Sequence, residues 1–226
     1  MKLSIIMPVL DEAAAIEAAL RALSLYRARG VELIVVDGGS SDGTPDLARP
    51  LSDRVLTAAR GRALQMNAGA AVARGDVLLF LHADTQLPAD ADRQVADGLN
   101  RSGRVWGRFD IRIEGGGLLR MVAAMMNTRS RLTGIATGDQ AMFVTRAAFD
   151  AVGGFPPIAL MEDLALSARL KRIRRPLALG ARVTTSPRRW HEHGTLRTIL
   201  KMWRLRLGFF LGADPAKLAR QYGYRY

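Results

Sequence analysis

The sequence contains no cysteine, few aromatic residues and no long uninterrupted apolar run. The absence of cysteine excludes disulfide bonds and thiolate metal sites, and it suits a reducing compartment. Aromatic residues make up 6% of the chain, which argues against a protein that stacks nucleobases on a row of rings. Charged residues interrupt every apolar stretch well before the roughly 20 residues of a transmembrane helix. The run at residues 3–10 is too short for a signal peptide, so we expect a cytoplasmic protein.

Two common nucleotide-binding motifs are also missing. No G-x-x-x-x-G-K-[ST] sequence exists, which argues against a P-loop nucleotide hydrolase. No G-x-G-x-x-G follows the first expected strand, as a dinucleotide-dependent dehydrogenase would require. That position holds Pro8, Asp11 and Glu12 instead of the glycine-rich, basic loop of a nucleotidyltransferase. A nucleotidyltransferase and a non-enzymatic polyanion-binding protein are kept as the alternative functions.

The chain is rich in positive charge. Its 33 basic and 21 acidic residues give a net charge of +12, which favours partners such as nucleotide phosphates or anionic lipid. A nucleic-acid binder would also use this charge, but it would have no need for Asp37, Asp84 and Asp163 at expected loop tips. We therefore expect no nucleic-acid partner. With 226 residues and 49% hydrophobic content, the chain is long enough for one domain with a substantial core.

The first 104 residues alternate short apolar runs with helix-like segments. Strands are expected at residues 3–7, 31–36, 55–58 and 77–81, with helices between them that begin near Asp11, Thr44 and Arg62. We expect Pro8 to stop the first strand, and Asp11 and Glu12 to cap the first helix, at residues 11–26. This order predicts an α/β fold with a doubly wound, mainly parallel sheet and helices on both faces.

The apolar run at residues 77–81 is the predicted central strand. Its five residues lie between a Gly-Asp pair and a polar cluster, as in a strand that is buried on both faces. Such a strand would deliver His82 and Asp84 to the carboxyl edge of the sheet, where open α/β folds bind ligands. A plain polar loop after a strand is the simpler interpretation of this stretch by itself.

The pattern changes after residue 104. Residues 105–114 alternate apolar and polar side chains, as in a half-exposed strand, and a Met-rich helix is expected to follow. We predict a nucleotide-binding half at residues 1–104, an acceptor half at residues 105–190 and a basic helical tail at residues 191–226.

Eight short motifs follow one another in a fixed order. They are residues 4–12, residues 35–44, Asn67-Ala68-Gly69, Gly75-Asp76, His82-Ala83-Asp84, Gly153-Gly154-Phe155, Glu162-Asp163 and Arg169. Together they resemble the family 2 glycosyltransferases, which have the GT-A fold. Their spacing, with Gly138-Asp139-Gln140 and Met161-Glu162-Asp163, also resembles a compact bacterial branch with mostly unassigned substrates. The resemblance implies inverting, non-processive transfer of a sugar from a nucleotide-sugar, with UDP as the expected nucleotide, to a hydroxyl or lipid-linked acceptor.

The resemblance also implies the catalytic groups. His82-Ala83-Asp84 stands where the family has an Asp-x-Asp that holds Mg²⁺ or Mn²⁺ on the diphosphate, so Asp84 and His82 are the expected metal ligands. Imidazole suits Mn²⁺ better than Mg²⁺, so His82 either weakens metal binding or contacts the ribose. Asp163, the second acid of the Glu162-Asp163 pair, is the implied general base. A helix-capping acidic pair is the alternative interpretation.

The remaining implied site residues fall into two groups. The nucleotide-binding group is expected to place Asp37 against a uracil base, and it consists of Pro8, Asp11, Glu12, Asp37, Gly38, Gly39, Arg60, Arg62, Asn67 and Ala83. The group around the donor sugar and the acceptor consists of Asp139, Gln140, Glu162 and Arg189. His191 and His193 are left open as further metal ligands or residues of a surface loop.

Residues 195–211 predict a cationic amphipathic helix. Apolar residues such as Leu196, Trp203 and Phe210 recur at helical spacing, and Arg197 and Lys201 lie apart from them. Packing against the catalytic domain, packing in a homodimer and binding to an anionic membrane surface all remain open. The last would place the protein at the inner face of the cell membrane, near a lipid-linked acceptor.

Overall fold

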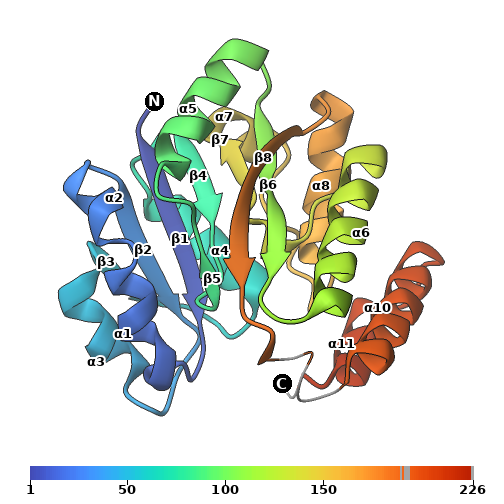
Figure 1. Cartoon of the computed structure of the whole chain (residues 1–226). Helices are drawn as coiled ribbons and strands as arrows, with labels where there is room; N and C mark the ends of the chain where they lie inside the picture. The colour runs from blue at the N-terminus through green and yellow to red at the C-terminus, as the bar shows by residue number, and fades with distance from the viewer. Residues whose placement is uncertain (189, 191–193, 225–226) are drawn as a thin grey trace.

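The computed structural model describes residues 1–188, 190 and 194–224 of the chain. One eight-stranded sheet runs through both predicted halves in the order β3-β2-β1-β4-β7-β6-β8-β5. Helices cover both of its faces (Figure 1). The predicted α/β fold class is therefore confirmed.

The N-terminal half supplies four parallel strands. β1 lies between β2 and β4, and β3 forms the edge beyond β2. Both β1 and β4 are buried along their whole length, because helices pack on each side of a parallel sheet. The elements are β1 (Leu3–Val9), α1 (Ala13–Arg21), α2 (Ser24–Ala28), β2 (Glu32–Asp37), α3 (Thr44–Ala48), η1 (Arg49–Leu51), β3 (Arg54–Thr57), α4 (Arg62–Val72) and β4 (Val77–Phe80).

The C-terminal half extends the same sheet with mixed pairing. β7 joins β4 antiparallel, β6 joins β7 antiparallel, β8 runs parallel to β6, and β5 closes the edge antiparallel to β8. The elements are β5 (Thr85–Gln86), α5 (Ala91–Ser102), β6 (Trp106–Ile113), α6 (Gly117–Thr133), η2 (Gly138–Gln140), β7 (Phe143–Thr145), α7 (Arg146–Ala151), α8 (Glu162–Ile173) and β8 (Leu177–Thr185). The short elements β5 and α7 are absent from the sequence prediction.

Two helices, α10 (Thr195–Phe210) and α11 (Pro215–Tyr222), form the tail. Leu205 and Leu218 are buried with Leu160, just before α8, and with Leu164 in its first turn, so the tail packs on the catalytic domain. The opposite side of α10 stays exposed, with Leu196, Leu200, Leu207 and Phe210 among its outward side chains. No helix in the described part of the chain has both the length and the apolar content that a membrane span requires.

Pro8 does not stop the first strand, as the sequence had led us to expect. It lies inside β1 and pairs with Val36 of β2. β4 ends at Phe80, which pairs with Ile6, and the Leu81 N–H donates to the Ile6 carbonyl. The backbone nitrogen of Pro8 faces the same side of β1 as the backbone of Ile6, toward β4. Because β4 has already ended there, the missing N–H of Pro8 removes no hydrogen bond between β1 and β4.

The expected helix at residues 11–26 is in fact two helices, α1 and α2. Glu12 stands at the N-cap position of α1, but its side chain makes no capping hydrogen bond. The Thr44 hydroxyl accepts a hydrogen bond from the Glu12 N–H at 2.8 Å, and the Asp42 carboxylate accepts one from the Ala13 N–H at 2.9 Å. Side chains that follow β2 therefore satisfy the N–H groups at the start of α1, a contact that no local pattern reveals.

The strand at residues 105–114 is not half-exposed. Within β6 only Arg112 is exposed, because α6 packs over the polar face. Arg108 is fully buried, pairs with Asp110 and donates to the Asn127 carbonyl of α6 at 3.3 Å. The second Asp110 oxygen accepts from Arg131 at 2.6 Å. Ion pairing lets a polar strand face become an interior surface.

Asn67 of α4 connects the two halves of the fold. Its side-chain amide donates to the Phe155 carbonyl at 2.8 Å, and its oxygen accepts from the Phe155 N–H at 3.0 Å. We expect Asn67→Ala to lower the free energy of unfolding by about 1–3 kcal/mol, because both backbone groups lose their partner. Urea denaturation measures this change. Asn100→Ala, at an exposed position of α5, is the matched control, and an equal loss in both variants would contradict the assignment.

Candidate active site

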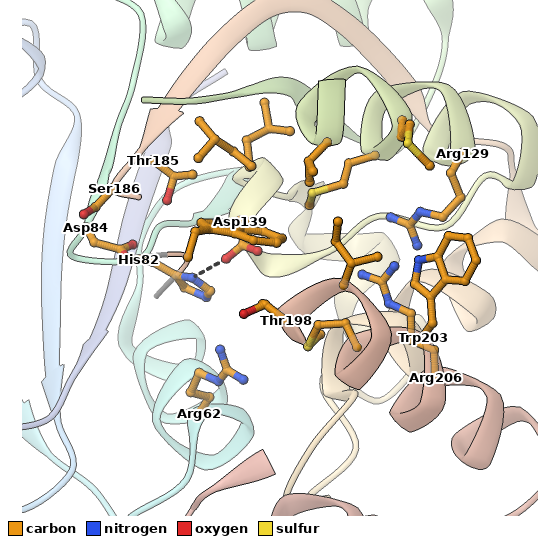
Figure 2. Close-up of a pocket in the computed structure, with 18 residues that line it drawn as sticks. Arg62, His82, Asp84, Arg129, Asp139, Thr185, Ser186, Thr198, Trp203 and Arg206 are labelled. Carbon is orange, nitrogen blue, oxygen red and sulfur yellow. Dashed lines mark ion pairs between the residues drawn. The ribbon is translucent and has the colours of Figure 1, made fainter. Parts of the chain in front are cut away.

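Two cavities open beside the carboxyl end of β4. The first cavity, of about 280 Å³, lies where β1 and β4 end and where α4 begins. The second cavity, of about 270 Å³, lies between β6, α6 and α10 and is drawn in Figure 2. Arg62, His82 and Asp84 line both of them. The predicted central strand therefore delivers His82 and Asp84 to a place that ligands can reach from two sides.

The first cavity collects about half of the predicted nucleotide-binding residues. These are Pro8, Glu12, Arg60, Arg62 and Ala83. Glu12 lies 3.6 Å from Arg188, and burial raises the pKa of the Glu12 carboxyl although Arg188 opposes that shift. Gln65, Arg188 and Tyr224 also line this cavity and are absent from the prediction. Only Gln65 carried a usable signal, since it lies on the helix that Arg60-Gly61-Arg62 opens.

Other members of the predicted nucleotide group hold the loop after β2. The Asp37 carboxylate accepts hydrogen bonds from the Gly39 and Ser40 N–H groups at 2.8 and 3.0 Å. Asp11 likewise accepts from the Ser41 N–H at 2.8 Å. A Cβ at Gly38 would lie 3.1 Å from the Gln65 side chain, so close packing explains that glycine.

None of Asp11, Asp37, Gly38, Gly39 and Asn67 lines either cavity. Their contact with a nucleotide stays a prediction.

The Gly138-Asp139 segment packs against His82. A Cβ at Gly138 would lie 2.7 Å from the His82 ring, so only glycine allows this approach. His82 Nδ1 is 3.4 Å from Asp139 Oδ1 (Figure 2), and the Gly138 N–H donates to Asp163 at 2.8 Å. Gln140 points elsewhere: it is fully buried, and its oxygen accepts from the Thr137 N–H. One short segment therefore positions both His82 and Asp163.

The two acids at the start of α8 have different surroundings. Glu162 is only 3% exposed and lies 3.1 Å from Arg62. Burial raises the pKa of the Glu162 carboxyl, and Arg62 opposes the shift. Burial acts to lower the pKa of Arg62, but the attraction of Glu162 and its neighbours outweighs burial and raises it. Asp163, in contrast, lines a third, small cavity of about 40 Å³ that Arg62 and His82 also reach.

The donor atoms at the end of β4 suit a cation that a diphosphate helps to hold. Asp84 is exposed and His82 is half-buried. Among residues 1–188, 190 and 194–224, no three His, Asp or Glu side chains are grouped to hold an ion by themselves. A cation that also binds phosphate oxygens needs only one or two protein carboxylates, and the chemistry of Asp84 and His82 is compatible with such a partial site. Metal binding by these two residues stays a prediction. Arg189, His191 and His193 lie outside the described residues.

The sequence prediction missed Arg129 and Arg206, which line the second cavity. Arg129 lies on the Met-rich helix α6 and Arg206 on the tail helix α10. Helical periodicity places them on their helices, but it does not show that the two helices face one cavity.

A parallel βαβ half, a mixed second half and polar residues at the carboxyl end of the central strand define the GT-A class of α/β proteins. Residues 4–153 match the model of glycosyl transferase family 2. The chain belongs to this family, and the predicted resemblance is confirmed.

Three similar proteins illustrate the relationship. The PGL/p-HBAD biosynthesis glycosyltransferase of Mycobacterium tuberculosis is 39% identical over 101 residues, which cover 41% of this chain and 40% of that protein. TarS of S. aureus, in complex with UDP-GlcNAc, has a TM-score of 0.66 and 18% identity, covering 82% of this chain and 58% of that one. The mannosyltransferase PcManGT from Pyrobaculum calidifontis, in complex with GDP-Man and Mn²⁺, has a TM-score of 0.67 and 19% identity, covering 99% of this chain and 69% of that one.

The pairing of the buried Glu162 with the partly exposed Arg62 leads to a prediction about stability. We expect Arg62→Gln to lower the free energy of unfolding by about 3–5 kcal/mol near pH 8, because Glu162 is left charged and buried. The loss should be smaller at pH 5. The pKa of the Glu162 carboxyl is raised above 4.5 in the folded protein. The protonated carboxyl therefore stabilises the folded state at low pH, and this stabilisation is lost as the pH rises from 4.5 through the raised pKa.

Urea denaturation at both pH values measures the effect. The double variant Arg62→Gln/Glu162→Gln is the control, and it should recover most of the stability at pH 8. An equal loss at the two pH values would contradict the assigned ion pair.

Proposed function

We propose that the protein transfers a sugar from a nucleoside diphosphate sugar, with UDP as the expected nucleotide, to an acceptor hydroxyl with inversion. The observation that carries this proposal is the meeting of the two cavities at Arg62, His82 and Asp84. Such an arrangement lets two ligands approach one point from different sides. The complexes of TarS with UDP-GlcNAc and of PcManGT with GDP-Man support a nucleotide-sugar as one of them.

The donor nucleotide occupies the first cavity in this proposal. Arg60, Arg62 and Arg188 bring positive charge to its walls, which suits a diphosphate. Asp84 with His82 would hold Mn²⁺ or Mg²⁺, and such a cation would supply positive charge to the leaving diphosphate. The Mn²⁺ in the PcManGT complex and the imidazole of His82 both favour Mn²⁺.

Asp163 is the proposed general base. Glu162 is unsuitable because it is buried and neutralised by Arg62, whereas Asp163 lines the cavity beside His82 and Asp139. The acceptor oxygen bonds to the anomeric carbon while the bond from that carbon to the diphosphate oxygen breaks. The proton of the acceptor hydroxyl passes to Asp163, and the electron pair of the broken bond leaves with the diphosphate. Attack opposite the leaving group inverts the anomeric carbon.

The second cavity is the proposed acceptor site. The exposed apolar side of α10 beside it supports a lipid-linked acceptor and peripheral binding to an anionic membrane. The same surface supports a homodimer as the alternative. A nucleotidyltransferase is less well supported, because the family match identifies glycosyltransferases.

Donor binding provides the first test. We expect Mn²⁺ to tighten UDP binding. In Asp84→Asn this increase in UDP affinity should be smaller by about tenfold or more, because the loss of a residue that supports a metal site lowers metal affinity by that order. UDP binding without metal should not weaken, because the substitution only removes a negative charge from the wall of the first cavity. Isothermal titration of UDP with and without MnCl₂ gives both values.

Asp97→Asn, at an exposed position of α5, is the matched control for donor binding. If Mn²⁺ tightened UDP binding equally in wild type and in Asp84→Asn, Asp84 would not be a metal ligand. GDP- and TDP-sugars in the same assay identify the preferred nucleotide.

Loss of the base provides the second test. We expect Asp163→Asn to slow UDP release from a UDP-sugar by about 10²–10⁴-fold, the usual contribution of a general base. UDP affinity should not change, because Asp163 does not line the first cavity. Asp150→Asn, on the exposed side of α7, is the control. A near-normal rate in Asp163→Asn would remove it from the mechanism.

A further inference from the structure

Two arginines lie close together at one end of the second cavity. Arg129 projects from α6 and Arg206 from α10, and Figure 2 shows their guanidinium groups side by side, away from Asp84 and His82. Nε and Nη2 of Arg129 and Nε of Arg206 are buried and have no hydrogen-bond partner among the described residues. Buried N–H groups of this kind are rare in folded proteins and point to a missing acceptor.

The charge of this arginine pair is poorly compensated by the chain itself. Burial lowers the pKa of Arg129 to about 10, and Arg206 adds to the shift. Burial also lowers the pKa of Arg206, while Asp163 and Asp139 act in the opposite direction. Both of these acids also have contacts elsewhere: Asp163 accepts from Gly138, and Asp139 lies beside His82.

Asp110 cannot serve the arginine pair either. Its two oxygens are taken by Arg108 and Arg131. Two like charges in a site of low dielectric repel each other and are costly to bury, so an anion that binds between them would be strongly favoured.

The rest of the cavity is largely apolar. Ile111, Val122, Met125, Met126 and Trp203 line it beside the arginine pair. A ligand that fills this space therefore needs an apolar portion next to its anionic group. Methionine walls adapt to aliphatic chains of different shapes.

We infer, building on the proposed function, that the acceptor is an amphiphilic oxyanion. Its phosphate or carboxylate group binds between Arg129 and Arg206, each of which presents a planar fork that matches such oxygens. Its apolar portion packs against Met125, Met126 and Trp203. Its hydroxyl then points toward Asp84 and His82 at the other end of the cavity, where His82 also lines the small cavity of Asp163.

The donor diphosphate is a weaker candidate for the arginine pair. The pair lines the second cavity and not the first, where Arg60 and Arg188 already provide positive charge. Binding both anions at one place would leave one group of arginines without an acceptor.

Octyl phosphate, at concentrations below its micelle threshold, is the probe. We expect isothermal titration to show binding to wild type that weakens about 10- to 100-fold in Arg129→Gln and in Arg206→Gln, as the loss of hydrogen bonds to a charged group predicts. Inorganic phosphate should bind more weakly than octyl phosphate. Octanol should not compete with octyl phosphate. UDP binding in the presence of Mn²⁺ should stay unchanged in both variants.

Arg120→Gln on α6 and Arg204→Gln on α10 are the matched controls, because both side chains are exposed on the same two helices. They should bind octyl phosphate as wild type does. Arg129→Lys and Arg206→Lys keep the charge but lose the fork, and they should show intermediate affinities. These lysine variants provide the same test if a glutamine variant does not fold.

Equal binding of octyl phosphate to wild type and the arginine variants would overturn the inference. Equal affinity for inorganic phosphate would overturn its amphiphilic part. A parallel loss of UDP affinity would assign the arginine pair to the donor, and so would also overturn the inference. If neither wild type nor any variant bound UDP, but the affinity for octyl phosphate still fell in the arginine variants, the proposed function would fail and the anion site would be supported.

Discussion

The ion pair between Arg62 and the buried Glu162 joins the parts of the structure on which the site depends. Arg62 begins α4 in the N-terminal half, Glu162 begins α8 in the C-terminal half, and the Tyr224 ring of the tail lies 5.5 Å from the Arg62 guanidinium. Arg62 also lines all three cavities. Because a buried carboxylate is costly without its partner, the pairing of Glu162 with Arg62 ties the two halves together at the site. It also distinguishes two neighbouring acids, since Glu162 is buried against Arg62 whereas Asp163 lines a cavity.

Many polar residues of the family motifs serve to hold other residues in place. Asp37 and Asp11 hold the loop after β2, and that loop in turn caps α1 through Asp42 and Thr44. Gly138 brings its N–H to Asp163 and lets the His82 ring pack closely. A site whose side chains are held by such contacts loses little entropy when a ligand binds. The same motif can therefore be needed for both stability and chemistry, and the sequence pattern alone does not distinguish the two.

The sequence predicts those features that depend on near neighbours in the chain. Apolar runs at β1, β2 and β4, separated by helical segments, were sufficient for the parallel half, and two of the polar residues after β4, His82 and Asp84, line two cavities of the candidate site. The errors come from distant partners: β4 ends early beside Pro8, α6 covers the polar face of β6, and the loop after β2 caps α1. Arg129 and Arg206 were missed for the same reason, because the crossing of α6 and α10 brings them together.

The distribution of charge supports an enzyme with two anionic ligands. Arg60 and Arg188 line the first cavity, Arg129 and Arg206 line the second, and Asp84 and Asp139 lie by the shared region around His82. An excess of positive charge spread evenly over the surface would mainly aid solubility and nonspecific binding. Here part of it is concentrated at two separate places that both open toward the same acids. A leaving diphosphate on one side and an anionic acceptor on the other would each be held by its own arginines, which keeps two negative ligands apart while their reacting atoms meet.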